Sequence, residues 1–82
     1  MEETFILTVV FKGRELEIPG TLRVSVYTHQ FILTVSGIQL VIEKDDEQNL
    51  RAFLPAEELK KGSTIDSGLV ALIVSELSKA LE

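Results

Sequence analysis

Apolar and polar residues alternate with a period of two in four consecutive segments of this chain, at 4–11, 15–27, 31–35 and 38–42. A shorter run at 50–54 continues the pattern. Such alternation is typical of strands that have one face in a core and the other in solvent. The apolar residues of the predicted inner face are Phe5, Leu7, Val9, Phe11, Leu16, Ile18, Leu22, Val24, Val26, Phe31, Leu33, Val35, Ile38, Leu40, Ile42, Leu50, Ala52 and Leu54.

Short loops between the segments predict which residues pair. We place these loops at Gly13-Arg14, Thr28-His29 and Ser36-Gly37. The cross-strand pairs that they predict are Phe11 with Leu16, Val26 with Phe31, and Val35 with Ile38. Partners across two strands point to the same side of a sheet, and all three registers put apolar residues together. The loops therefore predict a five-stranded antiparallel meander with its strands in sequential order.

Pro19-Gly20 interrupts the second segment, and this dipeptide is a strong turn signal. The alternation nevertheless keeps its phase from Ile18 to Leu22. Two interpretations stay open at this point. The chain either turns back in a hairpin, or forms one long strand with a kink at Gly20, where the inner face is bare.

Helical signals follow the last predicted strand. Residues 55–62 begin with proline, carry acids early and lysines late, and end with glycine, which indicates a helical turn. Asp66 is the predicted N-cap of a final helix from Ser67 to about Ala80. The predicted fold class is α+β: a five-stranded antiparallel β-meander with one C-terminal α-helix packed on one face. We expect one domain over 1–82, in which Leu81-Glu82 could belong to a cloning scar.

One helix is narrow for a sheet of this size. Five strands make a sheet roughly 24 Å wide, whereas a helix with its side chains is about 10–12 Å across. Either the sheet curls around the helix, or a ligand or a second chain covers the remaining apolar surface.

Composition excludes several classes of function. The formal net charge is −5 and there is no basic tract, which argues against nucleic acid as a partner. No apolar run approaches the length that spans a membrane. The chain has no cysteine, so disulfides and thiolate metal sites are excluded, and a cytoplasmic location is expected. We expect it to fold without a metal or a cofactor.

No set of residues in the sequence predicts catalysis. His29 is the only histidine, and no nucleophile or orienting partner is implied beside it, so a solvated turn is the favoured interpretation. Asp45, Glu47 and Asn49 could hold a cation weakly, although their segment lacks the glycine and glutamate spacing of a calcium loop. A solvated hairpin loop is favoured there too. We therefore predict that the protein is not an enzyme, with no catalytic, cofactor or metal residues.

The outer face of the predicted sheet is the candidate interaction surface. Its apolar residues are Ile6, Val10, Tyr27, Ile32, Val41 and Phe53. The first strand also forms an undefended edge if the strand order is sequential, which favours self-association.

Several stretches resemble small bacterial proteins known only as domains of unknown function. The matching stretches are 11–15, 27–31, 42–52 and 65–69. They are turns, strand edges and a helix start, so the resemblance implies the meander-plus-helix architecture and no activity.

The sequence does not establish a function. The favoured hypothesis is a small non-enzymatic protein-interaction module whose partner is either an unknown protein or, in a homodimer, a second copy of the chain. The alternative is a binder of a small apolar ligand held between a curled sheet and the helix.

Overall fold

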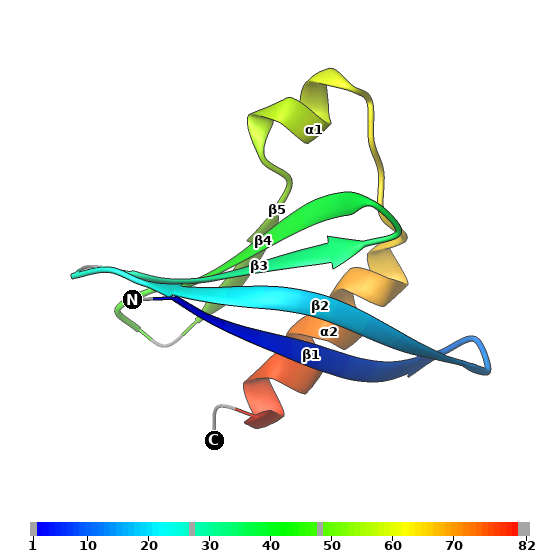
Figure 1. Cartoon of the computed structure of the whole chain (residues 1–82), viewed down its shortest axis with the longest axis horizontal. Coiled ribbons are helices and arrows are strands. Elements are labelled where there is room, and N and C mark those ends of the chain that lie inside the picture. The colour runs from blue at the N-terminus through cyan, green and yellow to red at the C-terminus, as the bar shows by residue number, and fades with distance from the viewer. Residues whose placement is uncertain (1, 27, 48, 81–82) are drawn as a thin grey trace.

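The computed structural model describes residues 2–26, 28–47 and 49–80, and it has the α+β architecture that the sequence predicts (Figure 1). Its five strands form one antiparallel sheet in sequential order. The elements are β1 (Glu2–Phe11), β2 (Arg14–Val24), β3 (His29–Val35), β4 (Ile38–Lys44), β5 (Leu50–Phe53), α1 (Ala56–Lys60) and α2 (Ser67–Ala80). The predicted meander, the helical turn and the bounds of the final helix are confirmed.

Two of the three loops differ from those predicted. The β3–β4 turn lies at Ser36-Gly37, as expected. The β1–β2 turn lies at Lys12-Gly13 rather than at Gly13-Arg14, so Phe11 pairs with Arg14. Both residues of each turn have positive φ, which is the type I′ geometry that matches the twist of a hairpin. The predicted β1–β2 register was therefore wrong by two residues.

The β2–β3 loop was also predicted wrongly. β2 ends at Val24 and β3 begins at His29, so the loop is longer than two residues. The Ser25 amide donates to the Thr28 carbonyl (2.9 Å), and the Thr28 amide donates to Ser25 Oγ (3.1 Å). These local bonds close the loop and compete with the strand ladder. Val26, predicted to face the core, is consequently 90% exposed.

Pro19-Gly20 lies inside one continuous strand, β2, which confirms the kink and excludes the hairpin turn. A Cβ atom on Gly20 would lie 2.6 Å from the side chains of both Phe5 and Leu33, so these side chains pack over the bare backbone. The β2–β3 ladder ends at the pair of Gly20 and Leu33. Pro19 has no amide hydrogen with which to extend it, so the first half of β2 leaves β3 and follows β1.

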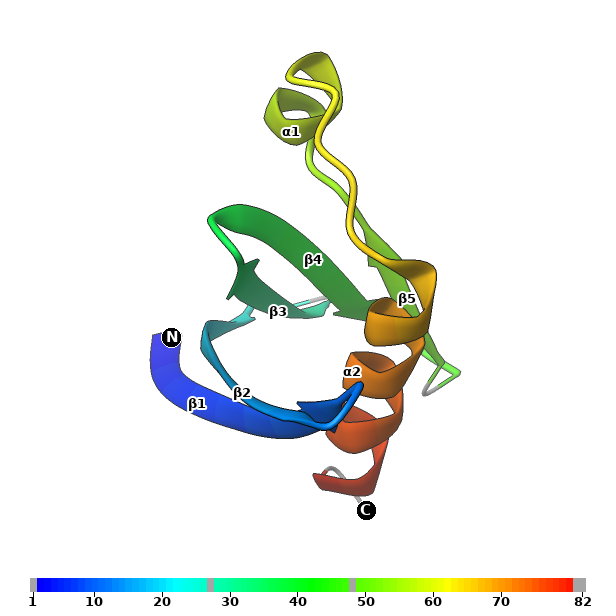
Figure 2. The same cartoon turned by 90° about the vertical axis from the view of Figure 1, so that its right-hand side faces the viewer.

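The sheet curls around α2, which resolves the mismatch between the widths of sheet and helix. α2 contacts both outermost strands, β1 and β5, and Figure 2 shows the sheet curving about it. The fully buried side chains of the core include Leu33, Leu40, Ile42 and Ile73. In the described ranges, neither helix has the length and apolar character that crossing a membrane requires.

Asp66 caps α2, as predicted, through a hydrogen bond from the Gly68 amide to its Oδ1 (2.8 Å). This bond, aided by the charge of Lys12, holds the pKa of Asp66 below its ordinary value. Lys12 Nζ lies 3.6 Å from Asp66 Oδ2. The β1–β2 turn is thereby linked to the start of the helix.

Candidate interaction surface

A row of side chains crosses the outer face of the sheet, opposite α2. Each member is the cross-strand partner of the next, in the order Thr4, Thr21, Ile32, Val41 and Phe53. Three of the six predicted surface residues therefore lie side by side on neighbouring strands. Their apolar side chains form one continuous contact across β3, β4 and β5.

The members of this row differ in exposure. Phe53 is 43% exposed, whereas Val41, between Ile32 and Phe53 in the row, is only 8% exposed. Ile32 is half-buried. Val41 lies on the outer face, as predicted, but it is buried there and offers little surface to a partner. Phe53 is therefore the main contact group at this end of the row.

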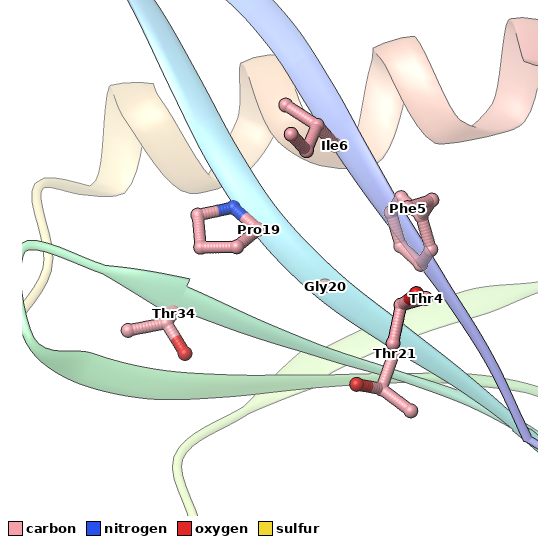
Figure 3. Close-up of a pocket in the computed structure, with 7 residues that line it drawn as sticks. All are labelled: Thr4, Phe5, Ile6, Pro19, Gly20, Thr21 and Thr34. Atoms are coloured by element: carbon pink, nitrogen blue, oxygen red, sulfur yellow. The ribbon is translucent and has the colours of Figure 1, made fainter.

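Ile6 lies at the other end of the outer face, opposite Pro19, and is 66% exposed. A pocket of about 460 Å³ adjoins it where β2 leaves β3 (Figure 3). The pocket is lined by Thr4, Phe5, Ile6, Pro19, Gly20, Thr21 and Thr34. We call it the outer pocket. Its position follows from the end of the β2–β3 ladder, which leaves a hollow on the outer surface.

The predicted surface residue Val10 is not part of this patch. It is 64% exposed but lies opposite Glu15, next to the β1–β2 turn and four residue pairs beyond Ile6. Tyr27 lies outside the described residues. The outer patch is accordingly defined by Ile6, which lines the outer pocket, and by Ile32 and Phe53, which lie in the row across β3 to β5.

A side chain caps one backbone amide of β4 just beyond the end of β5. Alternate residues of β4, among them Val41, direct their backbone groups toward β5, and Gln39 follows the same alternation. β5 stops at Phe53, so it supplies no acceptor for the Gln39 amide. Glu58 of α1 supplies one, since its Oε2 accepts this amide at 2.7 Å.

The role of Glu58 could not be read from its local sequence. Glu58 is 6% exposed, and its other oxygen lies 3.7 Å from Lys61 Nζ. Residues 39 and 58 are far apart in the chain and meet only in the folded sheet. The available signal is weak: a glutamate one turn after the proline that follows a short strand.

The opposite edge, β1, has no such cover. β1 pairs with β2 along its whole length. Phe11 and Arg14 flank a two-residue turn, which makes them a hydrogen-bonded pair, and the pattern alternates from there. The backbone groups of Thr4, Ile6, Thr8 and Val10 therefore point away from β2. Among the described residues, no hydrogen bond from a loop, helix or side chain reaches these groups.

A second cavity lies on the inner side, between β1 and the end of α2. Its volume is about 280 Å³. The apolar side chains that line it are Phe5, Ile6, Leu7, Leu22, Phe31, Leu77 and Ala80. This inner pocket occupies the position in which the sequence predicted an apolar ligand, and its volume lies just under the range that is usual for ligand sites, about 300–1,000 Å³.

The polar residues that the sequence offered for catalysis or cation binding are either exposed or hydrogen-bonded to the local backbone. His29 is the first residue of β3 and is exposed, rather than part of a loop. Asp45 Oδ1 accepts the amides of Glu47 and Asn49, both at 2.9 Å, so this carboxylate closes the β4–β5 loop. Within residues 2–26, 28–47 and 49–80, no three His, Cys, Asp or Glu side chains gather as metal ligands would.

Comparison of the chain with protein-family models, with curated proteins and with solved structures finds no match. The resemblance in the turns and strand edges therefore assigns no family. The outer patch, the two edges of the sheet and the inner pocket are therefore the features that bear on function.

Proposed function

We propose that this chain is a small, non-enzymatic protein-interaction module that binds a protein partner through the outer face of its sheet. The observation that carries the proposal is the exposure of two large apolar side chains, Ile6 and Phe53, on a face that α2 leaves uncovered. Aromatic side chains such as Phe53 are enriched among the residues that contribute most to binding, and Ile6 lines the outer pocket at the other end of the same face.

The polar groups support a binding role over a catalytic one. The carboxylates of Glu58, Asp45 and Asp66 each accept backbone amides, which accounts for their positions by structure alone. The absence of cysteine agrees with a reducing compartment, and we propose the cytoplasm.

Site-specific photo-crosslinking in the native cells tests this proposal. A benzophenone amino acid at Phe53 replaces one aromatic side chain with another, and the same group at Ser75, an exposed position of α2, is the matched control. We expect discrete protein adducts from position 53 that position 75 does not give, and we expect Ile6→Lys to reduce them. Equal adducts at both positions, or none at position 53, would contradict the proposal.

A second candidate function rests on the inner pocket. Its apolar lining suits a small apolar molecule, about the size of one or two aromatic rings. Naphthalene is a suitable probe: if the pocket binds it, the unfolding midpoint rises with its concentration. Leu77→Trp would fill the cavity and remove this shift. An unchanged midpoint at naphthalene saturation would exclude the candidate.

A further inference from the structure

We infer that this chain also binds a second copy of itself, paired antiparallel through the β1 edge about a two-fold axis at Thr8. The inference goes beyond the proposed function, because it assigns a second contact at the sheet edge opposite the one that carries Phe53. It predicts a sheet that continues from one copy into the next. Figure 1 shows β1 as the strand at one border of the sheet.

The first step is the contrast between the two edges. An open edge presents unpaired amides and carbonyls that another edge can satisfy, and proteins usually blunt such edges. Here Glu58 takes the free amide of Gln39 on one side. On the other side, β1 has ten residues and the outward groups of Thr4, Ile6, Thr8 and Val10 remain available. β5 has only four residues and presents fewer outward groups than β1. Of these two edges, β1 is therefore the one suited to pairing.

The second step is the register. Only residues whose backbone groups point outward can form hydrogen-bonded pairs, so even-numbered residues of β1 must pair with even-numbered residues of the copy. An axis at Thr8 places Ile6 opposite the partner's Val10, and Val10 opposite the partner's Ile6. These side chains are 66% and 64% exposed in the single chain. This register covers both of them with apolar surface.

Neighbouring registers match the side chains less well. An axis at Ile6 would place Glu2 opposite the partner's Val10, which sets a charge against an apolar group. An axis at Leu7 would place Ile6 opposite the partner's Thr8, and Val10 opposite the partner's Thr4. The axis at Thr8 is therefore the one that buries the exposed apolar groups against each other.

The third step is charge. The net charge of −5 opposes association in general, but the β1 edge is acidic at its start, with Glu2 and Glu3, and basic at its end, with Lys12 and Arg14. Antiparallel pairing brings the acidic start of each copy toward the basic end of the other. Glu2 already contacts Arg23 at 3.0 Å, so we expect a modest contribution that salt reduces.

The absence of cysteine makes a direct test of the register possible. In a hydrogen-bonded antiparallel pair the Cα atoms are about 5.5 Å apart, within the range of about 4.4–6.8 Å that a disulfide spans. Thr8→Cys should therefore cross-link to its copy under mild oxidation. Thr4→Cys is the matched control on the same strand and face, because in this register the two copies of residue 4 are roughly 27 Å apart. Thr34→Cys is a control away from the edge.

We expect Thr8→Cys to form a covalent dimer at least tenfold faster than either control at the same protein concentration. Sedimentation equilibrium gives the second readout: Val10→Lys should weaken dimerisation at least tenfold, whereas Val26→Lys, in the exposed β2–β3 loop, should not. Equal cross-linking rates would overturn the register. A monomer mass up to several hundred micromolar would overturn the inference altogether, while the photo-crosslinking at Phe53 would still decide the proposed function.

Discussion

The two edge strands of this sheet differ in length and in the groups that lie beside them. On one side β5 is four residues long, and the carboxylate of Glu58 replaces the strand that would have followed it beside Gln39. On the other side, β1 runs for ten residues with no described element paired beyond it. The β5 edge is therefore short, with a side chain capping the strand beyond its end, whereas the β1 edge is long and presents more outward groups. This difference is the basis for the proposed pairing through β1.

Both edges depend on α2, so the largest effect is expected from its core contact. Ile73 is fully buried, and Ile73→Ala should lower the free energy of unfolding by about 2–5 kcal/mol, because it removes buried methyl groups and leaves a cavity. Urea unfolding measures this, with the exposed Ser75→Ala as control. A loss below about 1 kcal/mol would show that α2 does not hold the edges together.

The curl that brings β1 to α2 depends on Gly20. Gly20→Ala would place a Cβ atom 2.6 Å from Phe5 and Leu33, so we expect a loss of about 1–3 kcal/mol through overpacking. Phe5→Leu shortens one of the two clashing side chains, so the loss caused by Gly20→Ala should be smaller in a Phe5→Leu background. If Gly20→Ala is neutral in urea unfolding, the close packing over this glycine is not what shapes the sheet.

Removing the carboxylate of Glu58, which caps the Gln39 amide beyond β5, should lower the stability by a smaller amount. Glu58→Ala leaves the Gln39 amide without its acceptor, at a cost of about 1–2 kcal/mol. Glu58→Gln keeps an acceptor oxygen and should lose much less. Exchange of the Gln39 amide hydrogen should accelerate in the alanine variant only. Equal protection of this amide in both variants would show that Glu58 does not cap it.

The smallest effect concerns Asp66, which links the β1–β2 turn to α2. Its pKa in the folded chain is lowered, first by the Gly68 amide and then by Lys12, from an ordinary value of 3.8. Its contribution to stability is therefore complete above about pH 3.8 and is lost as the pH falls through the lower, folded value. Asp66→Asn keeps a capping oxygen but cannot titrate, so its unfolding midpoint should fall less steeply in acid. Identical acid profiles would contradict the role of the charge.

The faces of the sheet could be predicted from the sequence, whereas most of the registers could not. A shift by an even number of residues keeps every side chain on its predicted face, so alternation cannot distinguish Gly13-Arg14 from Lys12-Gly13 as the turn. Similarly, it placed Val26 with the core, although hydrogen bonds of Ser25 end the strand before it. The turn at Ser36-Gly37 was predicted correctly. Only these two residues separate the apolar Val35 and Ile38, whereas four residues separate Phe11 from Leu16 and leave the position of that turn open.

The candidate site was predictable to the same degree. Alternation placed Ile6, Val10 and Phe53 on the outer face, where all three are exposed. It gave no information on the burial of Val41 within the folded row. The hydrogen bond from the Gln39 amide to Glu58 could not be predicted, because these residues meet only in the tertiary fold.

Residue-resolved amide hydrogen exchange, measured at low and high protein concentration, tests the difference between the edges most directly. We predict that the amides of Ile6, Thr8 and Val10 exchange freely in the dilute protein and become protected as its concentration rises. The Leu7 amide, which pairs with β2, and the Gln39 amide, which Glu58 holds, should be protected throughout. Protection of the three β1 amides equal to that of Leu7 in the dilute protein, or free exchange of all three at the highest concentration, would contradict the account.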